Sequence, residues 1–278
     1  MYLRTSLLAL AVVLGGCSSP DEMDDALGQP NAAGAVATPS GSNSQGKSGA
    51  VAIAEETDLF SFEYAYPAQA AALAPLGAEL ARRQKDAKAR LTSEAQTDQQ
   101  GAQEAGFPYR KHSLAETWKV VADLPDFLSL TGEFSTYSGG AHGNHGMTSL
   151  VWDKKAAAPI SGSDMFISPA RLGSAVGDRF CAAIDRQRAH KRGPEAMADG
   201  RSSFTNCPAM SELTIIPGSR GGIPGSRDGT AFDRVGFYAG PYVAGPYAEG
   251  SYEVTLPVDA AMLAAVKPEY KSAFEVQR

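Results

Sequence analysis

The sequence predicts an α+β fold with two small, mainly antiparallel sheets, each packed with a helix. Three observations lead to this fold class. A helical repeat of apolar residues fills 68–105, and three stretches of apolar–polar alternation follow it between 118 and 152. A second helical stretch, 169–190, then precedes three further short strand candidates. Helices and strands do not alternate as they do in a βαβ chain, so a parallel sheet is not expected.

Residues 1–16 have the pattern of a secretory signal peptide. Arg4 precedes an apolar run, Leu7–Leu14, that is too short to stay in the membrane as an anchor. The run ends in Leu-Gly-Gly-Cys, which resembles the lipobox of bacterial lipoproteins and implies cleavage before Cys17 and acylation of that cysteine. The alternative is an ordinary secretory signal with a chance cysteine. The residue after Cys17 is not Asp, which favours the outer membrane if the cell has two membranes.

Residues 17–54 are expected to form a lipidated, flexible tether, because they are rich in small and polar residues and lack hydrophobic periodicity. Within this segment, 41–48 fits the P-loop pattern letter for letter. A P-loop needs a buried strand before it and a helix after it, and neither flank has such a pattern. We therefore expect no nucleotide. The net charge of -6 also argues against nucleic-acid binding, which needs a basic surface.

The first half of the folded part predicts one strand, one long helix and a meander. An aromatic-rich run over 59–66 is typical of a strand and ends at Pro67. The helix over 68–105 should bury the face formed by Leu73, Leu76, Leu80, Ala87, Leu91 and Ala95. The three alternating stretches, 118–123, 128–136 and 147–152, predict strands with one buried face, joined as an antiparallel meander.

The second half predicts a helix followed by three strands and a short final helix. Ser168 and Pro169 form a helix start, with Ser as N-cap and Pro at the first helical position. The helix should run to about His190 and bury Leu172, Val176, Phe180 and Ile184. Strands are expected at 213–216, 232–238 and 251–256, and a short helix at 259–266.

Cysteine usage predicts one disulfide. With Cys17 lipidated, Cys181 and Cys207 are left as an even pair in an oxidising compartment. The alternative is two unrelated buried thiols.

The glycine-rich segment 137–146 is the first candidate site. It contains Gly139 and Gly140, followed by His142 and His145, between two of the meander strands. One interpretation is that His142 hydrogen-bonds backbone and fixes a tight hairpin connection. A second is direct contact with a ligand. A third is a metal half-site, which would need a further ligand such as Glu133 or Asp153.

A doubled Gly-Pro-Tyr motif is the second candidate site. It places Tyr242 and Tyr247 in the connection between the last two strands. Tyrosine has an apolar face and a polar tip, which suits sugar rings and protein partners. The alternative is that these rings only pack the core and the turn.

These segments carry a family resemblance. The meander with Tyr-Ser-Gly-Gly-Ala-His-Gly at its turn, followed by 160–166, resembles a PdaC-like domain passing into the C-terminal domain of RsiV-like proteins. The segment 240–257 resembles the closing hairpin of that second domain. The resemblance covers about 55–270 and implies a PdaC-like domain at 55–159 and an RsiV C-terminal-like domain at 160–278. Such domains occur in anti-sigma factors that sense lysozyme and in front of peptidoglycan deacetylases.

No segment of the sequence predicts a sigma-binding part or a deacetylase domain. We therefore expect a lipid-anchored, non-catalytic protein of the cell envelope, on the periplasmic side, that needs no cofactor. Its expected partner is peptidoglycan or a lysozyme-type hydrolase. The alternatives are a metal-assisted envelope hydrolase that uses His142 and His145, and a structural envelope protein without a small ligand.

Overall fold

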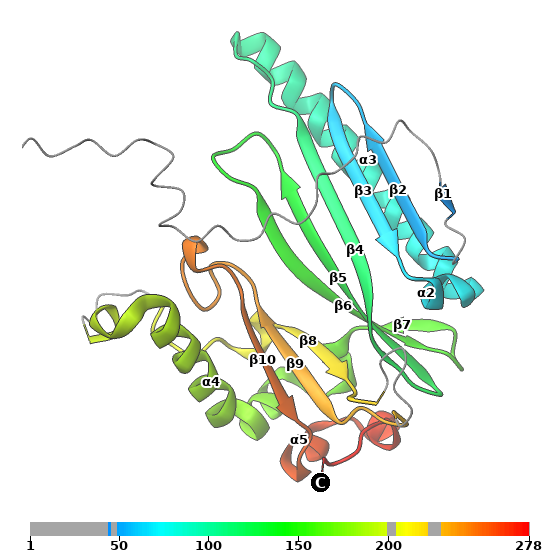
Figure 1. Cartoon of the computed structure of the whole chain (residues 1–278), viewed down its shortest axis with the longest axis vertical. Helices are drawn as coiled ribbons and strands as arrows, with labels where there is room; N and C mark the ends of the chain where they lie inside the picture. Colours follow the sequence, from blue (N-terminus) through cyan, green and yellow to red (C-terminus); the bar gives the residue numbers. More distant parts are fainter. Residues whose placement is uncertain (1–43, 46–48, 199–203, 222–228, 278) are drawn as a thin grey trace, which may run out of the picture. The chain divides into compact units, whose positions relative to one another are not determined.

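The computed structural model describes residues 44–45, 49–198, 204–221 and 229–277. They form a seven-stranded sheet, in the order β1-β2-β3-β4-β5-β6-β7, and a three-stranded sheet, in the order β10-β9-β8. Helices pack on both sheets (Figure 1). The predicted α+β class, with a meander in the first half, is confirmed.

The first sheet contains one parallel pair among antiparallel ones. Its strands are β1 (Ser44–Gln45), β2 (Val51–Glu56), β3 (Phe60–Tyr66), β4 (His112–Asp123), β5 (Phe127–Tyr137), β6 (Asn144–Asp153) and β7 (Ala158–Ile160). Only β3 and β4 run parallel. The chain leaves β3, passes through the helices and returns to the same end of the sheet, and such a crossover makes the next strand parallel.

The long predicted helix is present but broken near its start. Its two parts are α2 (Ala68–Ala72) and α3 (Ala74–Ala105), and Leu73 between them has an extended backbone. The break precedes Pro75, which lacks the N–H that a continuous helix needs. Gly106 ends α3 in the left-handed conformation. The helix buries all the predicted positions from Leu76 onward against β3 and β4.

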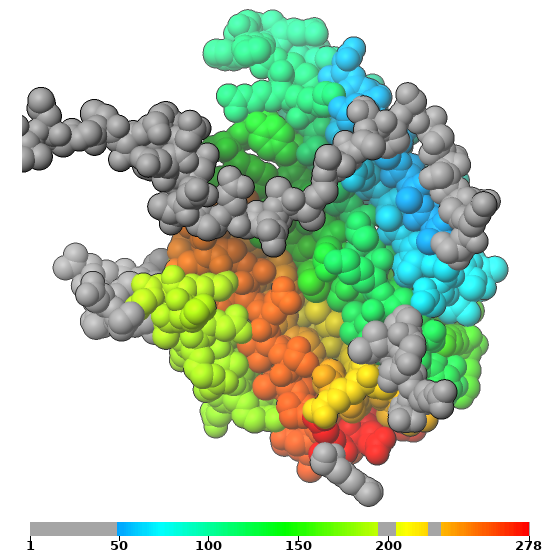
Figure 2. Space-filling model, viewed as in Figure 1, coloured from blue at the N-terminus to red at the C-terminus, as the bar shows by residue number. Residues whose placement is uncertain are grey.

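The second half is built around one long helix and the smaller sheet. Its elements are η1 (Gly162–Met165), α4 (Pro169–Ala198), η2 (Met210–Glu212), β8 (Thr214–Gly218), β9 (Arg234–Ala239), η3 (Tyr247–Glu249), β10 (Tyr252–Pro257), α5 (Ala260–Ala265) and η4 (Pro268–Ala273). The Ser168 hydroxyl accepts a bond from the N–H of Arg171, which confirms the predicted cap. The four predicted apolar positions of α4 are buried. Figure 2 shows α4 beside β10.

Several element boundaries differ from the expected ones. Strand β4 begins at His112, six residues before the expected start at 118, and β7 was not expected. Strand β2 begins at Val51, inside the stretch expected as tether. The strand was not expected because small alanines between the larger Val51 and Ile53 weaken its alternation. Helix α4 continues past His190 to Ala198, with a non-helical glycine at 193. The expected division into domains at 55–159 and 160–278 stays a prediction.

The second half packs on the first sheet through β8. The Ser129 hydroxyl of β5 donates to the Pro217 carbonyl at 2.6 Å, and the Thr214 hydroxyl donates to the Met147 carbonyl at 2.8 Å. One of the two hydrophobic clusters takes residues from both sheets, with Val151 on the first and Val235 on the second. These contacts set the spacing between the sheets beside β8.

Candidate functional site: a cluster of rings beside a cleft between the sheets

The predicted His loop is the connection between β5 and β6, and its glycines are required by the backbone. Gly139 has a φ of +82°, which favours glycine. A Cβ on Gly143 would lie 2.8 Å from the Thr136 carbonyl oxygen. His142 places its Nδ1 2.8 Å from the Gly143 oxygen. The carbonyl of Gly140 accepts bonds from the Tyr137 hydroxyl and from Arg110.

The Gly-Pro-Tyr connection lies between β9 and β10. Tyr242 has a φ of +68°, and its side chain is 56% exposed. Tyr247 begins the short helix η3. A side chain on Gly245 would displace Glu249, because a Cβ would lie 2.1 Å from the carboxylate of Glu249.

The structure brings the two predicted sites together. The rings of His142 and Tyr247 stack with centroids 3.9 Å apart, and the Tyr247 hydroxyl donates to the Gly143 carbonyl at 2.7 Å. His145 and Tyr242 each place their rings 5.8 Å from that of Tyr247. We call His142, His145, Tyr242 and Tyr247 the ring cluster.

Helix α4 supports the ring cluster through Glu249. Arg192 donates from Nε and Nη2 to the two carboxylate oxygens of Glu249, at 2.8 and 3.0 Å. Lys191 donates to the Glu249 and Ser251 carbonyls. Because Glu249 lies two residues after Tyr247, these bonds hold the backbone that carries the ring. The sequence does not predict this support, although basic residues stand at the end of the predicted helix.

Glu249 and Tyr252 form a coupled pair in this support. Burial raises the pKa of the Glu249 carboxyl, but bonds from Arg192 and from the Tyr252 hydroxyl outweigh it, and the pKa lies below its usual 4.5. Burial and the neighbouring Glu249 carboxylate raise the pKa of Tyr252 to about 12. Glu249 is therefore an anion and Tyr252 a neutral donor near neutral pH.

A cleft of about 510 Å³ opens between the two sheets next to the ring cluster. We call it the inter-sheet cleft. From the first sheet it is lined by Glu133 of β5 and His145 of β6, and from the second by Tyr238 and Glu253. Glu133 is paired with Lys119 at 2.5 Å. His145 belongs to both the cleft and the ring cluster, so the two features form one continuous site.

The cleft combines acceptors with a neutral donor. Burial raises the pKa of the Tyr238 hydroxyl, which keeps its proton at neutral pH. Glu133 and Glu253 supply carboxylate acceptors, and small hydroxyl side chains add groups that both donate and accept. Such a site suits a neutral or cationic ligand that is rich in hydroxyl or amide groups.

The metal interpretation requires a third ligand near the two histidines. Among the described residues, no group of three or more His, Cys, Asp or Glu side chains could hold a metal ion. Asp153 lies at the far end of β6, eight residues from His145, which is about 27 Å along a strand. Its carboxylate instead accepts bonds from the N–H groups of Lys155 and Ala156.

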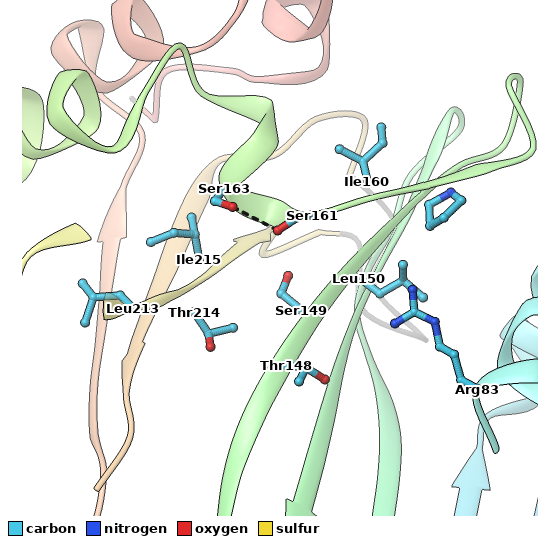
Figure 3. A pocket seen from close by; sticks show the side chains of 11 residues that line it. Arg83, Thr148, Ser149, Leu150, Ile160, Ser161, Ser163, Leu213, Thr214 and Ile215 are labelled. Atoms are coloured by element: carbon cyan, nitrogen blue, oxygen red, sulfur yellow. Dashed lines mark hydrogen bonds between the residues drawn. The ribbon is translucent and has the colours of Figure 1, made fainter. Parts of the chain in front are cut away.

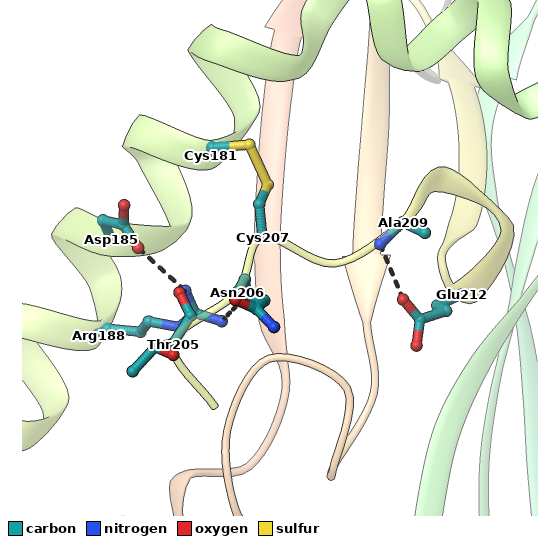
Figure 4. The surroundings of a disulfide bond; sticks show 8 residues. All are labelled: Cys181, Asp185, Arg188, Thr205, Asn206, Cys207, Ala209 and Glu212. Atoms are coloured by element: carbon teal, nitrogen blue, oxygen red, sulfur yellow. Dashed lines mark hydrogen bonds and ion pairs between the residues drawn. A yellow bond between two sulfur atoms is a disulfide. The ribbon is translucent and has the colours of Figure 1, made fainter. Parts of the chain in front are cut away.

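The predicted disulfide between Cys181 and Cys207 is confirmed (Figure 4). It ties α4 to the segment that leads into β8. Arg188 lies seven residues after Cys181 on α4 and is almost fully buried. It donates to the carbonyls of Thr205, Asn206 and Ala244. The disulfide and Arg188 therefore hold the same segment against α4, and Arg188 also reaches the Gly-Pro-Tyr connection.

The predicted signal peptide, the lipidation site Cys17 and most of the P-loop-like segment lie outside the described residues. Within the described part of the chain, no helix combines the length and the apolar character needed to cross a bilayer.

Comparisons with known proteins give a family match and several similar structures, two of which are DUF3298 family proteins. Residues 53–145 match the family model described as Deacetylase PdaC, a span that runs from β2 into β6 and includes the His loop. A crystal structure of a DUF3298 family member from Bacteroides fragilis is 15% identical and covers 81% of this chain and 95% of its own, with a TM-score of 0.48. A DUF3298 family protein from Pseudomonas aeruginosa is 16% identical and covers 82% and 96%, with a TM-score of 0.49. No curated protein matched the chain.

Proposed function

We propose that this chain is a lipid-anchored, non-catalytic binding protein of the bacterial cell envelope, and that its ligand is a glycan component of the cell wall. The observation that carries the proposal is the ring cluster beside the inter-sheet cleft. Tyr247 and His142 come from connections that are far apart in the sequence, yet their rings stack beside the inter-sheet cleft, which is lined by His145 of the same cluster.

The chemistry of this site matches that of a glycan. The apolar faces of sugar rings pack on aromatic side chains, and Tyr242 offers an exposed ring for such contact. Sugar hydroxyls and N-acetyl amides can donate to Glu133 and Glu253 and accept from Tyr238. A volume of about 510 Å³ is also in the range of small-ligand sites.

The envelope location rests on the signal-peptide and lipobox pattern of residues 1–17. The name of the matched family refers to a deacetylase. We extend this by proposing an RsiV C-terminal-like domain over 160–278 and lipidation at Cys17. A Cys17→Ser variant should then lose labelling by a radioactive fatty acid and leave the membrane fraction; retention of both would contradict the anchor.

Binding can be tested by co-sedimentation of the purified protein with insoluble peptidoglycan. We expect the wild type to sediment, and Tyr247→Ala and His145→Ala to sediment at least about fivefold less. Phe107→Ala is the matched control, because Phe107 is 71% exposed and lies outside the site. A wild type that stays in the supernatant, or variants that bind equally well, would overturn the glycan proposal.

Two further measurements separate the other functions. Retention of the protein on immobilised c-type lysozyme, without sedimentation on peptidoglycan, would favour a protein partner over a glycan. The hydrolase would be favoured if the purified protein contained stoichiometric metal and released acetate or muropeptides from peptidoglycan. Both the metal and this activity should then be lost in His142→Ala.

A further inference from the structure

A second cavity, of about 490 Å³, lies beside the edge of β6 (Figure 3). It shares no lining residue with the inter-sheet cleft. Its walls come from β6, from the segment that leads from β7 into η1, from the start of β8, and from one side chain of α3. The proposed glycan site does not use any of these groups.

Among the described residues that line this cavity, Arg83 of α3 is the one charged residue. Its Nε donates to Glu79 at 2.7 Å, and among the described residues its two terminal nitrogens have no hydrogen-bond partner. These nitrogens form the end of the guanidinium fork, which matches the two oxygens of a carboxylate or phosphate. Glu79 and Glu116 offset part of the charge of Arg83, but neither carboxylate lines the cavity.

Hydroxyl groups supply most of the remaining polar wall. Ser149, Ser161, Ser163 and Thr214 all line the cavity. The Ser149 hydroxyl is inaccessible and has no partner among the described residues, which is costly for a buried polar group. Figure 3 shows Ser149 between β6 and the segment that carries Ser161. Rotation of the Ser149 side chain about χ1 would turn this hydroxyl toward the cavity, where a ligand could satisfy it.

We propose that this cavity is a second binding site, and that it takes a small organic oxyanion on a hydroxylated body. Arg83 binds the carboxylate or phosphate, and the serine and threonine hydroxyls bind the polar body. Leu150 and Ile215 line the apolar part of the wall, which packs on the carbon skeleton. A sugar acid and a sugar phosphate share this chemistry.

Calorimetric titration of the purified protein tests the site with three probes of similar size. Glucuronate carries a carboxylate, glucose 1-phosphate carries a phosphate, and glucose carries no charge. We expect at least one anionic probe to bind and glucose to bind at least tenfold more weakly. The preferred anion identifies which oxyanion the site takes.

Three variants connect binding to the cavity. Arg83→Gln removes the charge and should weaken the anionic probe at least about tenfold, because a hydrogen bond between charged groups is lost. Ser149→Ala should weaken it about threefold to tenfold while the melting temperature stays the same or rises, because an unpartnered buried hydroxyl is removed. Lys85→Gln on the exposed face of α3 is the matched control and should leave binding unchanged.

The outcomes decide the proposal. Failure of both anionic probes to bind would overturn it, as would equal binding of glucose or a loss in Lys85→Gln as large as in Arg83→Gln. If Arg83→Gln does not fold, weaker binding of the anionic probe to Ser149→Ala still tests the proposal. Neither variant touches the ring cluster, so sedimentation on peptidoglycan should be unaffected by both.

Discussion

Gly143 is the residue on which the geometry of the His loop depends most directly. Its carbonyl accepts the bond from Tyr247, and its Cα faces the Thr136 carbonyl with no room for a side chain. The composition of the loop indicates that glycine is needed, but it does not indicate which of the four glycines is needed for which reason. The contacts of each backbone position separate them.

Gly143→Ala should therefore lower stability, and Gly140→Ala should not. An added methyl group at 143 would meet a backbone oxygen that cannot move without shifting β5, at a cost of about 1–3 kcal/mol. At 140 the nearest atom is 4.0 Å away, and the change should stay within about 0.5 kcal/mol. Urea unfolding measures both. Equal destabilisation by the two variants would contradict the assigned contacts.

Tyr242 combines an exposed ring with a strained backbone. A left-handed conformation costs a residue with a Cβ about 1–2 kcal/mol. Tyr242→Gly should therefore be more stable than Tyr242→Ala by roughly 1 kcal/mol, although both lose the ring. If the ring contacts the glycan, both variants should bind peptidoglycan equally weakly. If Tyr242→Ala were more stable than Tyr242→Gly, the assigned backbone strain at Tyr242 would be wrong. If both variants bound peptidoglycan as well as the wild type, Tyr242 would not belong to the site.

At the scale of elements, α4 connects the second sheet to the site. Its apolar face packs on β10, its cysteine holds the segment before β8, and its basic end holds the connection that carries Tyr247. The apolar face and the disulfide were predictable from local spacing and cysteine parity. The role of the basic end was not, because a run of Arg and Lys at a helix terminus also fits a solvated surface.

Arg188→Met should be strongly destabilising. The variant would leave three carbonyl groups without their donor, those of Thr205, Asn206 and Ala244, and a loss of about 3 kcal/mol or more is expected. Arg186→Met on the exposed side of the same helix is the matched control, with an expected change within about 0.5 kcal/mol. Thermal unfolding of both variants would measure the difference. A small loss in Arg188→Met would mean that water replaces the guanidinium.

Removal of the disulfide should lower stability without changing the fold. The bridge joins residues 26 apart, and the chain-entropy model gives about 3 kcal/mol for a loop of this length. The double variant Cys181→Ser, Cys207→Ser should therefore unfold at lower urea concentration but keep its far-ultraviolet circular dichroism. Unchanged stability would show that Arg188 alone holds the segment.

At the scale of the whole molecule, acid should weaken the support of the site. The folded-state pKa of Glu249 lies below the usual 4.5, so its contribution to stability is present above about pH 4.5 and is lost as the pH falls through the lower folded-state value. The free energy of unfolding should drop less between pH 7 and pH 3.5 in Glu249→Gln than in the wild type. Equal drops would mean that Glu249 is not linked to stability.

The sequence predicted the elements of this molecule better than their arrangement. Apolar spacing identified α3 and α4, and alternation identified β4, β5 and β6. Each of these patterns arises within a single helix or strand and can therefore be read from the local sequence. The parallel pairing of β3 with β4 depends on the path of the intervening helices. The meeting of His142 with Tyr247 depends on how the second sheet packs on the first. Neither has a local signature.

The hydrogen bond from Tyr247 to Gly143 joins residues 104 positions apart, and this separation also sets an order in time. A ribosome adds about 5–20 residues per second, so roughly 5–20 s pass between synthesis of the His loop and of the ring that stacks on it. A chain interrupted in that interval but after Ile160 would contain the strands of the first sheet and an uncovered His142. The ring cluster is therefore completed only after the chain has reached Tyr247.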